Sequence, residues 1–260
     1  MALEPLWKYL GGKRALVKPV IAALGSGWSR YVEPCVGAGA VALAMPEGTR
    51  MVLADVDAPL VRLWRRVQTA PEALALEVAA LTAEPMTAAR HRALREREIR
   101  GSEAALLVAI QASFNGLYRR GRFGLLNAPW NHRGEVSVPG TLDLVEVAAH
   151  LRRAEILHRD AVELLEDCGR GDAVYLDPPY VGTQAYSGGR PWRWDDLDPM
   201  IAAAERAAGR GARVVLSHAD APALRARLRG WALTEVEARR PVNRDGAGRG
   251  AVGEVVARIG

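Results

Sequence analysis

Short apolar runs and helical patterns alternate in the first part of the chain. Apolar residues at Tyr31–Glu33 and Met51–Ala54 predict two strands, and a helical pattern follows from about Ala58 to Val67. Strand–helix–strand spacing of this kind is typical of a parallel sheet with crossover helices. The start of the chain therefore favours an α/β fold.

The middle of the chain follows a different pattern. From 71 to 113, apolar residues recur at helical spacing, as at Leu74, Val78 and Leu81. Residues 114–140 then form an irregular stretch rich in Gly, Asn, Arg and Pro. An irregular stretch of this length usually has a function of its own.

Strand–helix alternation resumes after this stretch. Three further strands and a closing hairpin are predicted at 155–158, 173–176, 214–216, 231–236 and 254–259. We therefore expect a mostly parallel sheet flanked by helices, formed by residues 1–67 and 151–260. Residues 68–150 are expected to form a helical insertion that interrupts this sheet.

Composition narrows the class of protein. The 260 residues are 49% hydrophobic, which is enough to bury a substantial core. A formal net charge of +5 favours a polyanion partner, because Lys and Arg displace counterions from phosphate. The two cysteines, Cys35 and Cys168, form no zinc or disulfide pattern, which indicates a reducing compartment. Without a membrane-spanning apolar run or a signal-peptide pattern at its start, the chain is expected in the cytoplasm.

A glycine-rich segment, Glu33-Pro34-Cys35-Val36-Gly37-Ala38-Gly39, follows the first predicted strand. Gly37 and Gly39 allow a tight turn and a close approach of ligand to backbone. The segment fits a nucleotide-type cofactor, but it also fits a simple strand–helix turn. Asp55, at the end of the second strand, can accept both hydroxyls of a ribose. Alternatively, Asp55 or Asp57 caps the next helix.

The segment Asp177-Pro178-Pro179-Tyr180 follows a buried strand, at the end where open α/β sheets bind ligands. An exocyclic amine is a poor nucleophile, because its lone pair is delocalised into the ring. The Asp177 carboxylate and the Pro178 carbonyl can each accept one N–H of such an amine, and the two prolines hold both acceptors in place. Tyr180 offers a flat face to a base that has flipped out of a duplex.

Five motifs in this order resemble the Dam-type DNA adenine methyltransferases, the D12 class in its α group. The resemblance extends over nearly the whole chain. It rests on Lys8-Tyr9-Leu10-Gly11-Gly12-Lys13, Glu33-Pro34 with Gly37 and Gly39, Leu53-Ala54-Asp55, Phe114-Asn115-Gly116-Leu117-Tyr118-Arg119 with Asn127-Ala128-Pro129, and Asp177-Pro178-Pro179-Tyr180. It implies a class I S-adenosylmethionine-dependent methyltransferase fold, Rossmann-like, with residues 1–67 and 151–260 as the catalytic domain. It also implies that the inserted helical domain, residues 68–150, recognises the target and contacts DNA through a hairpin.

The resemblance also assigns roles to residues. It implies that Asp177 and Tyr180 hold the target adenine. The positions that it implies for S-adenosylmethionine are Tyr9, Lys13, Glu33, Gly37, Gly39, Asp55 and Asp177. Cys35 stands where the family usually has an aromatic residue, and Leu125-Leu126 replaces another aromatic in a shorter recognition loop. Sequence specificity is therefore not carried over.

The loop from 114 to 122 holds the expected DNA contacts. Asn115 can bind an adenine edge with two hydrogen bonds, and an arginine can bind guanine in the same way. Arg119 is the expected base reader, because it closes the segment that resembles the family's recognition signature. Arg120 and Arg122 are expected to contact phosphates, which position DNA without specifying its sequence. The alternative is a basic loop that only faces solvent.

The sequence thus predicts an adenine-N6 methyltransferase that uses S-adenosylmethionine, acts on double-stranded DNA, needs no metal, and works as a monomer or a weak dimer. One alternative is an N4-cytosine methyltransferase, whose target amine suits the same tetrapeptide. Two others are a nucleotide-dependent oxidoreductase and a DNA-binding protein that has lost catalysis. Ser217-His218, after a late strand, either lines the base pocket or lies at the surface.

Overall fold

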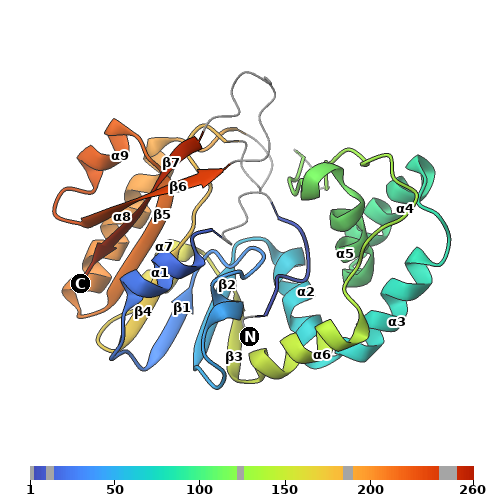
Figure 1. Cartoon of the computed structure of the whole chain (residues 1–260), viewed down its shortest axis with the longest axis horizontal. Coiled ribbons are helices and arrows are strands. Elements are labelled where there is room, and N and C mark those ends of the chain that lie inside the picture. The colour runs from blue at the N-terminus through green and yellow to red at the C-terminus, as the bar shows by residue number, and fades with distance from the viewer. Residues whose placement is uncertain (1–2, 10–14, 122–125, 184–189, 240–250) are drawn as a thin grey trace.

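The computed structural model describes residues 3–9, 15–121, 126–183, 190–239 and 251–260 (Figure 1). Its strands are β1 (Arg30–Glu33), β2 (Met51–Asp55), β3 (Ala154–His158), β4 (Asp172–Leu176), β5 (Arg213–Ala219), β6 (Ala232–Arg239) and β7 (Ala251–Ile259). Its α-helices are α1 (Val17–Leu24), α2 (Ala58–Thr69), α3 (Pro71–Thr82), α4 (Ala88–Ile99), α5 (Glu103–Ala112), α6 (Thr141–His150), α7 (Ala161–Glu166), α8 (Trp194–Gly209) and α9 (Pro222–Arg227).

The strands form a 7-stranded sheet in the order β3-β2-β1-β4-β5-β7-β6. β1 to β5 run parallel, and β7 runs antiparallel between β5 and β6. Each strand predicted from the apolar runs is present, including the closing hairpin, so the predicted α/β fold with a mostly parallel sheet is confirmed. Because β1 to β5 are parallel, the carboxyl ends of these strands share one edge of the sheet.

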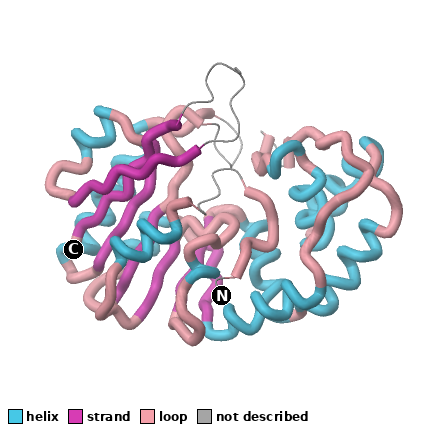
Figure 2. The backbone as a smooth tube through the Cα atoms, in the orientation of Figure 1, coloured by secondary structure: helices cyan, strands magenta, loops and turns pink. Residues whose placement is uncertain are grey.

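Side chains that alternate along the strands build an apolar core on each face of the sheet. Val32, Val52 and Val174 belong to a cluster that includes residues of α7, α8 and α9. Tyr31 and Tyr175 belong to the opposite cluster, which includes residues of α1 and α2 and continues into the helices α3 to α6. Figure 2 shows the strands gathered on one side of the molecule and α3 to α6 on the other.

The helices α3 to α6 lie between α2 and β3 in the chain. The helical stretch predicted at 71–113 is divided into α3, α4 and α5, because Thr87 and Ser102 each accept a hydrogen bond from a backbone N–H and so begin a new helix. α5 is buried along nearly its whole length. The sequence did not predict α6, which follows the irregular stretch. No helix in the described parts of the chain has the length and apolar character to cross a membrane.

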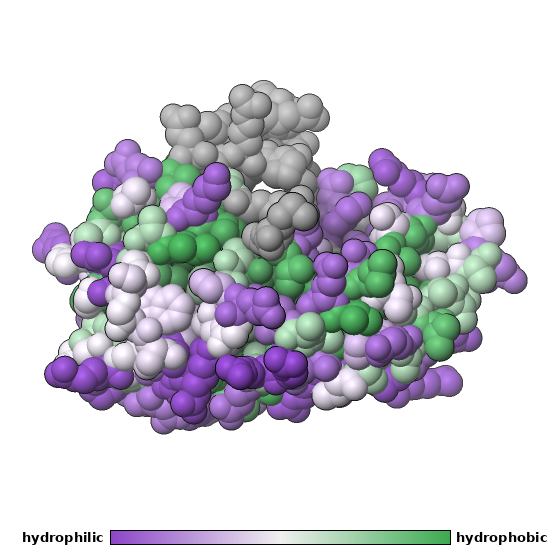
Figure 3. Space-filling model, turned by 60° about the horizontal axis from the view of Figure 1, so that its bottom comes forward, coloured by the Kyte–Doolittle hydropathy of each residue, from purple (hydrophilic) through white to green (hydrophobic). Residues whose placement is uncertain are grey.

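Among the described residues, few large apolar side chains are exposed, and two of them adjoin predicted site residues. Val56 is 58% exposed and follows Asp55, and Phe114 is 51% exposed and precedes Asn115. On the face shown in Figure 3, hydrophilic residues line the lower rim and apolar residues gather above it. Val56 and Phe114 thus expose apolar surface next to two predicted binding residues, Asp55 and Asn115.

Candidate active site

The tetrapeptide Asp177-Pro178-Pro179-Tyr180 leaves the sheet directly after β4, whose five residues are all buried. β4 lies between β1 and β5 in the sheet. Glu33 ends β1, Asp177 follows β4 and Ser217 lies two residues before the end of β5, so all three lie at the same edge of the sheet. The sequence placed Asp177 at this edge, and the structure adds its neighbours on both sides.

Asp177 accepts a hydrogen bond from the β5 side chain next to it. The Ser217 hydroxyl donates to Asp177 Oδ1 at 3.0 Å, and the Tyr175 hydroxyl lies 2.8 Å from Ser217 Oγ. Ser217 is fully buried and Tyr175 nearly so. Burial, reinforced by the negative charge of Asp177, holds the pKa of Tyr175 well above its usual value, so its hydroxyl stays protonated. The carboxylate that the sequence singled out thus ends a short chain of hydroxyl groups.

Tyr180 packs against His218, for which the sequence predicted either a place in the base pocket or a place at the surface. Its ring centroid lies 4.6 Å from that of His218, with an angle of 30° between the ring planes. His218 Nε2 accepts the backbone N–H of Val181 at 3.1 Å, and Nδ1 lies 3.0 Å from the Ala219 carbonyl oxygen. His218 is only 2% exposed, so the interpretation of it as a surface group is wrong. It braces the turn that carries the tetrapeptide.

The glycine-rich loop after β1 takes a path that side chains would hinder. Gly37 and Gly39 have φ angles of 49° and 65°. A Cβ atom on Gly37 would lie 3.1 Å from the Tyr9 ring, and one on Gly39 would lie 3.0 Å from the Trp64 ring. Trp64 Nε1 also donates to the Gly37 carbonyl at 2.9 Å. Two predicted cofactor residues, Tyr9 and Gly37, are therefore in contact.

Asp55 and Asp57 have separate tasks. Asp57 caps α2, since its Oδ1 accepts the backbone N–H of Leu60 at 3.1 Å. Asp55 accepts the N–H of Asp57 at 3.0 Å and the N–H of Gly37 at 3.1 Å. The alternative in which Asp55 caps the helix is wrong. Asp55 instead holds the glycine-rich loop against the end of β2.

Two acidic groups at this edge of the sheet have raised pKa values. Burial raises the pKa of Asp55 to about 6, against the backbone hydrogen bonds that lower it. Burial likewise raises the pKa of Glu33 to about 8. The Tyr31 hydroxyl and the Ala42 N–H both donate to Glu33 Oε2, at 2.7 and 3.1 Å. Glu33 is thus mainly protonated at neutral pH and adds little negative charge beside Asp177.

The N-terminal motif lies against the recognition segment. The ring centroids of Tyr9 and Tyr118 are 5.3 Å apart, and the backbone N–H of Lys8 donates to Gln111 Oε1 at 3.3 Å. Gly116 has φ 65°, and a Cβ atom there would overlap Lys8. Lys13, which the sequence placed in the cofactor site, lies outside the described residues.

The predicted DNA-binding residues separate into different environments. Asn115 is exposed with a left-handed φ of 52°, and Arg119 is half-buried, with its Nε donating to the Asn127 carbonyl at 2.7 Å. Isolated bridges join Ser113 to Trp130 and Arg120 to Leu126, so the segment folds back on itself as expected of a hairpin. Arg122 lies outside the described residues.

Arg120 is buried and does not face solvent as a phosphate contact would. It is 9% exposed, and its guanidinium donates to Asp57 Oδ2 at 2.6 Å, Glu98 Oε1 at 3.0 Å and the Tyr118 hydroxyl at 2.6 Å. A guanidinium directed to two buried carboxylates is not presented to a phosphate. The predicted phosphate contact of Arg120 is therefore wrong, and Arg120 belongs to a buried ion-pair network.

Several site residues gave little signal in the sequence. Tyr175 looks like an ordinary strand aromatic, and Glu98 lies in a strongly basic helical stretch that looks solvated. One signal was available for Glu98, because it recurs at helical spacing with His91 and Leu94. In the structure all three side chains are buried. Nothing comparable points from Ser217 to Asp177, which is remote in the chain.

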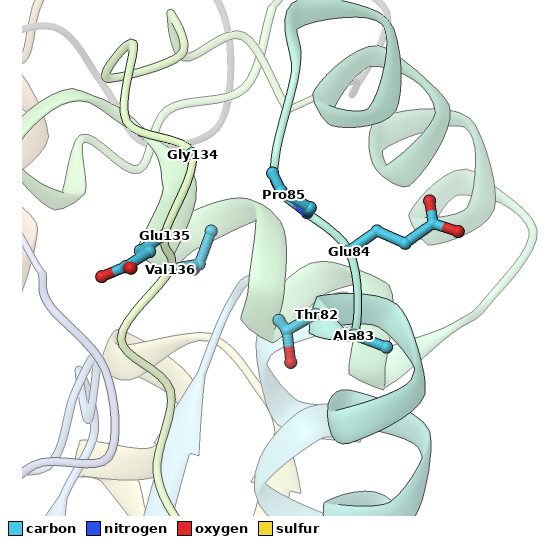
Figure 4. Close-up of a pocket in the computed structure, with 7 residues that line it drawn as sticks. All are labelled: Thr82, Ala83, Glu84, Pro85, Gly134, Glu135 and Val136. Carbon is cyan, nitrogen blue, oxygen red and sulfur yellow. The ribbon is translucent and has the colours of Figure 1, made fainter.

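A hollow of about 410 Å³ lies in the helical part of the chain, between two segments that hold no predicted site residue. It is lined by Thr82, Ala83, Glu84, Pro85, Gly134, Glu135 and Val136. Figure 4 shows that the carboxylates of Glu84 and Glu135 point away from each other. None of the predicted site residues lines it, so the edge of the sheet at β1, β2, β4 and β5 stays the candidate active site.

Comparison with known proteins agrees with this arrangement. The family model described as "D12 class N6 adenine-specific DNA methyltransferase" matches residues 9–192. A DNA adenine methylase of Vibrio cholerae is 29% identical, with 96% of this chain and 94% of that protein covered. A DNA N-6-adenine-methyltransferase of Escherichia phage P1 is 27% identical, with 96% of this chain and 35% of the phage protein covered. The match spans both the glycine-rich loop and the tetrapeptide.

Proposed function

Because the chain belongs to the D12 class of N6 adenine-specific DNA methyltransferases, we propose that it transfers a methyl group from S-adenosylmethionine to adenine N6 in double-stranded DNA. The observation that carries this proposal is the position of Asp177. It lies at the carboxyl end of β4, held by Ser217, at the same sheet edge as the glycine-rich loop and Asp55. The family is adenine-specific, which argues against the N4-cytosine alternative. The oxidoreductase alternative gives no role to the Asp177 carboxylate.

The residues at the ends of β1 and β2 fit S-adenosylmethionine. The Gly37 backbone has no Cβ between it and the Tyr9 ring, and Asp55 presents a carboxylate beside the same glycine. A carboxylate is the acceptor that a ribose needs, and a glycine backbone lets a nucleoside approach closely. We assign Tyr9, Glu33, Gly37, Gly39 and Asp55 to this site, with Lys13 expected beside them.

Asp177 and the Pro178 carbonyl provide two acceptors for the target amine. Each accepts one N–H of adenine N6, which localises the nitrogen lone pair and directs it toward the methyl group. When bound, S-adenosylmethionine supplies that methyl group on a positively charged sulfur. The Asp177 carboxylate then holds the N–H from which the proton leaves after the nitrogen has been methylated. Most of the rate enhancement comes from positioning and preorganised acceptors.

Tyr180 supports the flipped adenine in this proposal. Tyr180 is 9% exposed and His218 packs against its ring, so the base is proposed to stack on the side of the ring that His218 does not cover. Base–aromatic stacking contributes about 1–3 kcal/mol per base. The two prolines between Asp177 and Tyr180 restrict the backbone and so fix the position of the Tyr180 ring relative to the two acceptors.

The helical part of the chain, residues 68–150, is proposed to recognise DNA, while residues 1–67 and 151–260 carry catalysis. Asn115 and Arg119 are the proposed base contacts, and Arg122 a phosphate contact. The exposed position of Asn115 and the hairpin pairing around it support this assignment. A cytoplasmic location and action as a monomer or weak dimer on DNA belong to the same proposal.

The direct test is to identify the methylated nucleoside. Protein is incubated with methyl-labelled S-adenosylmethionine and duplex DNA, the DNA is digested, and the nucleosides are separated. We expect label in N6-methyladenine, and Asp177→Ala should reduce it to background while the protein still folds. Asp167→Ala, at an exposed aspartate that ends α7, is the matched control and should keep full activity. Label in N4-methylcytosine, or normal turnover by Asp177→Ala, would overturn the proposal.

A further inference from the structure

β4 and β5 place Ser217 beside two residues of the tetrapeptide strand. The parallel register pairs Tyr175 with Val215 and Leu176 with Leu216, so Ser217 follows directly beside Asp177. Residues two apart in a strand share a face. Tyr175 and Asp177 therefore point to the same side as Ser217, and Ser217 touches both.

The direction of each hydrogen bond follows from the number of protons available. An ionised carboxylate only accepts, and a serine hydroxyl has a single proton to donate. Ser217 gives its proton to Asp177 Oδ1 and must therefore accept at the same oxygen from the Tyr175 hydroxyl. The raised pKa of Tyr175 keeps that hydroxyl protonated. The three groups form an ordered chain from Tyr175 through Ser217 to Asp177.

Burial makes this chain rigid. Ser217 is 0% exposed and Tyr175 is 1% exposed. A buried hydroxyl without a partner costs about 1–3 kcal/mol, so neither group can turn away to water. The neighbouring β5 positions, Val214, Val215 and Leu216, are apolar, as the interior of a parallel sheet favours. A serine at this point of β5 is explained by what it contacts rather than by packing.

β5 also holds the other end of the tetrapeptide. His218 accepts the N–H of Val181, the residue after Tyr180, and its ring packs on that of Tyr180. Consecutive residues of β5 thus contact both ends of the segment. Ser217 differs from His218 in that it touches the reacting carboxylate itself.

We propose that Ser217 is a positioning residue for the methyl transfer, orienting the Asp177 carboxylate toward the amine, and that Tyr175 acts on Asp177 only through Ser217. This inference rests on the proposed role of Asp177. A carboxylate fixed before the substrate arrives needs no reorganisation during the reaction. Because β4 and β5 are buried and rigid, the hydrogen bonds from Tyr175 and Ser217 hold the Asp177 side chain in one orientation.

The test compares Ser217→Ala, Tyr175→Phe and the double variant. Single-turnover methylation of duplex DNA is measured at saturating protein and S-adenosylmethionine, alongside dissociation constants for both ligands and the melting temperature. Ser217→Ala should slow methyl transfer about 10- to 100-fold, because small misplacements of reacting groups cost that much. Affinities should change less than about threefold. Ser217→Thr keeps the hydroxyl and should restore most of the rate.

The double variant tests the order of the chain. Tyr175→Phe alone should slow transfer by a smaller factor, because Ser217 still donates to Asp177. Combined with Ser217→Ala it should add nothing, since its route to Asp177 is already gone. If Ser217→Ala does not fold, Tyr175→Phe still tests the chain: a reduced rate at unchanged affinities supports it, and a wild-type rate overturns it.

Ser102→Ala is the matched control. Ser102 caps α5 through the N–H of Ala105, so its loss lowers thermal stability without touching Asp177. Its transfer rate should equal that of the wild type. The inference fails if Ser217→Ala transfers methyl at the wild-type rate, or if its loss is entirely one of ligand affinity. Asp177→Ala separates the two proposals. If Asp177→Ala is inactive and Ser217→Ala is fully active, the proposed role of Asp177 stands and only the inference about Ser217 fails.

Discussion

Asp55 and Asp57 show how two identical side chains, two positions apart, take different roles at the end of one strand. Asp57 faces into the first turn of α2 and caps it. Asp55 remains at the sheet edge and holds the glycine-rich loop through the Gly37 N–H. The chain turns from β2 into α2 between these two residues, and this turn gives the first the loop contact and the second the helix cap.

This separation predicts different losses for the two variants. Asp55→Asn should weaken S-adenosylmethionine binding by about 1–3 kcal/mol, because it removes charge-assisted hydrogen bonds to the ribose. Asp57→Ala should mainly lower the free energy of unfolding, by about 0.5–2 kcal/mol for the lost cap and more for the lost partner of Arg120. Isothermal calorimetry and urea unfolding measure the two quantities.

The pH dependence of binding provides the control. Because burial raises the pKa of Asp55 to about 6, the carboxyl becomes protonated as the pH falls through that value and accepts hydrogen bonds less well. Wild-type affinity for S-adenosylmethionine should therefore fall below about pH 6, and that of Asp55→Asn should depend less on pH. Equal affinities for the two proteins at pH 7.5 would contradict the ribose contact.

At the scale of elements, the recognition segment follows strand-like alternation. Tyr118 and Arg120 are buried, whereas Arg119 between them is half-buried. A period of two therefore directs neighbouring arginines to opposite sides of the backbone. The sequence predicted a base contact for Arg119 and a phosphate contact for Arg120, and this alternation is the reason that Arg119 keeps its proposed DNA contact whereas Arg120 does not.

Arg119→Ala should reduce methylation of the recognised site by about 1–3 kcal/mol in transition-state free energy and relax the preference at one guanine position. Arg122→Ala, at the proposed phosphate contact, should weaken all sequences alike and reduce the salt slope by about one. Methylation of a randomised duplex library at two salt concentrations, followed by sequencing, measures both. If Arg119→Ala lowers activity equally on every sequence, Arg119 does not read a base.

At the scale of the whole molecule, the Arg120 network joins parts of the chain that bear different functions. Arg120, from the recognition segment, contacts Asp57 at the start of α2 and Glu98 on α4. Tyr9 adds a second link, since its ring lies between Gly37 of the glycine-rich loop and Tyr118. The proposed cofactor and DNA sites are thus packed against each other through a few buried groups.

Arg120→Ala should destabilise the protein by about 3–5 kcal/mol, because it leaves Asp57 and Glu98 as buried carboxylates without their cation. Neutralising both acids in the same protein, with Arg120→Met, Asp57→Asn and Glu98→Gln, should recover most of that loss. Urea unfolding at pH 7.5 measures each free energy. An Arg120→Ala protein within about 1 kcal/mol of the wild type would show that the network contributes little.

The sequence by itself determined the strand pattern and the identity of the chemistry. Apolar runs predict each strand of the sheet, because the periods of strand and helix depend on neighbouring residues. Asp177-Pro178-Pro179-Tyr180 indicates an activated amine because its carboxylate, its constrained turn and its aromatic ring are adjacent in the chain. The division of the helical stretch into α3, α4 and α5 could have been predicted from the caps Thr87 and Ser102.

Only the tertiary structure decided which polar side chains meet. Ser217 lies 40 positions from Asp177, and Arg120 lies 63 positions from Asp57. A buried polar group is stable only with a partner, and its local sequence does not say which distant group that is. The inward turn of Arg120 and the hydroxyl chain behind Asp177 therefore follow from how the strands and helices pack, since packing alone brings those groups within hydrogen-bonding distance.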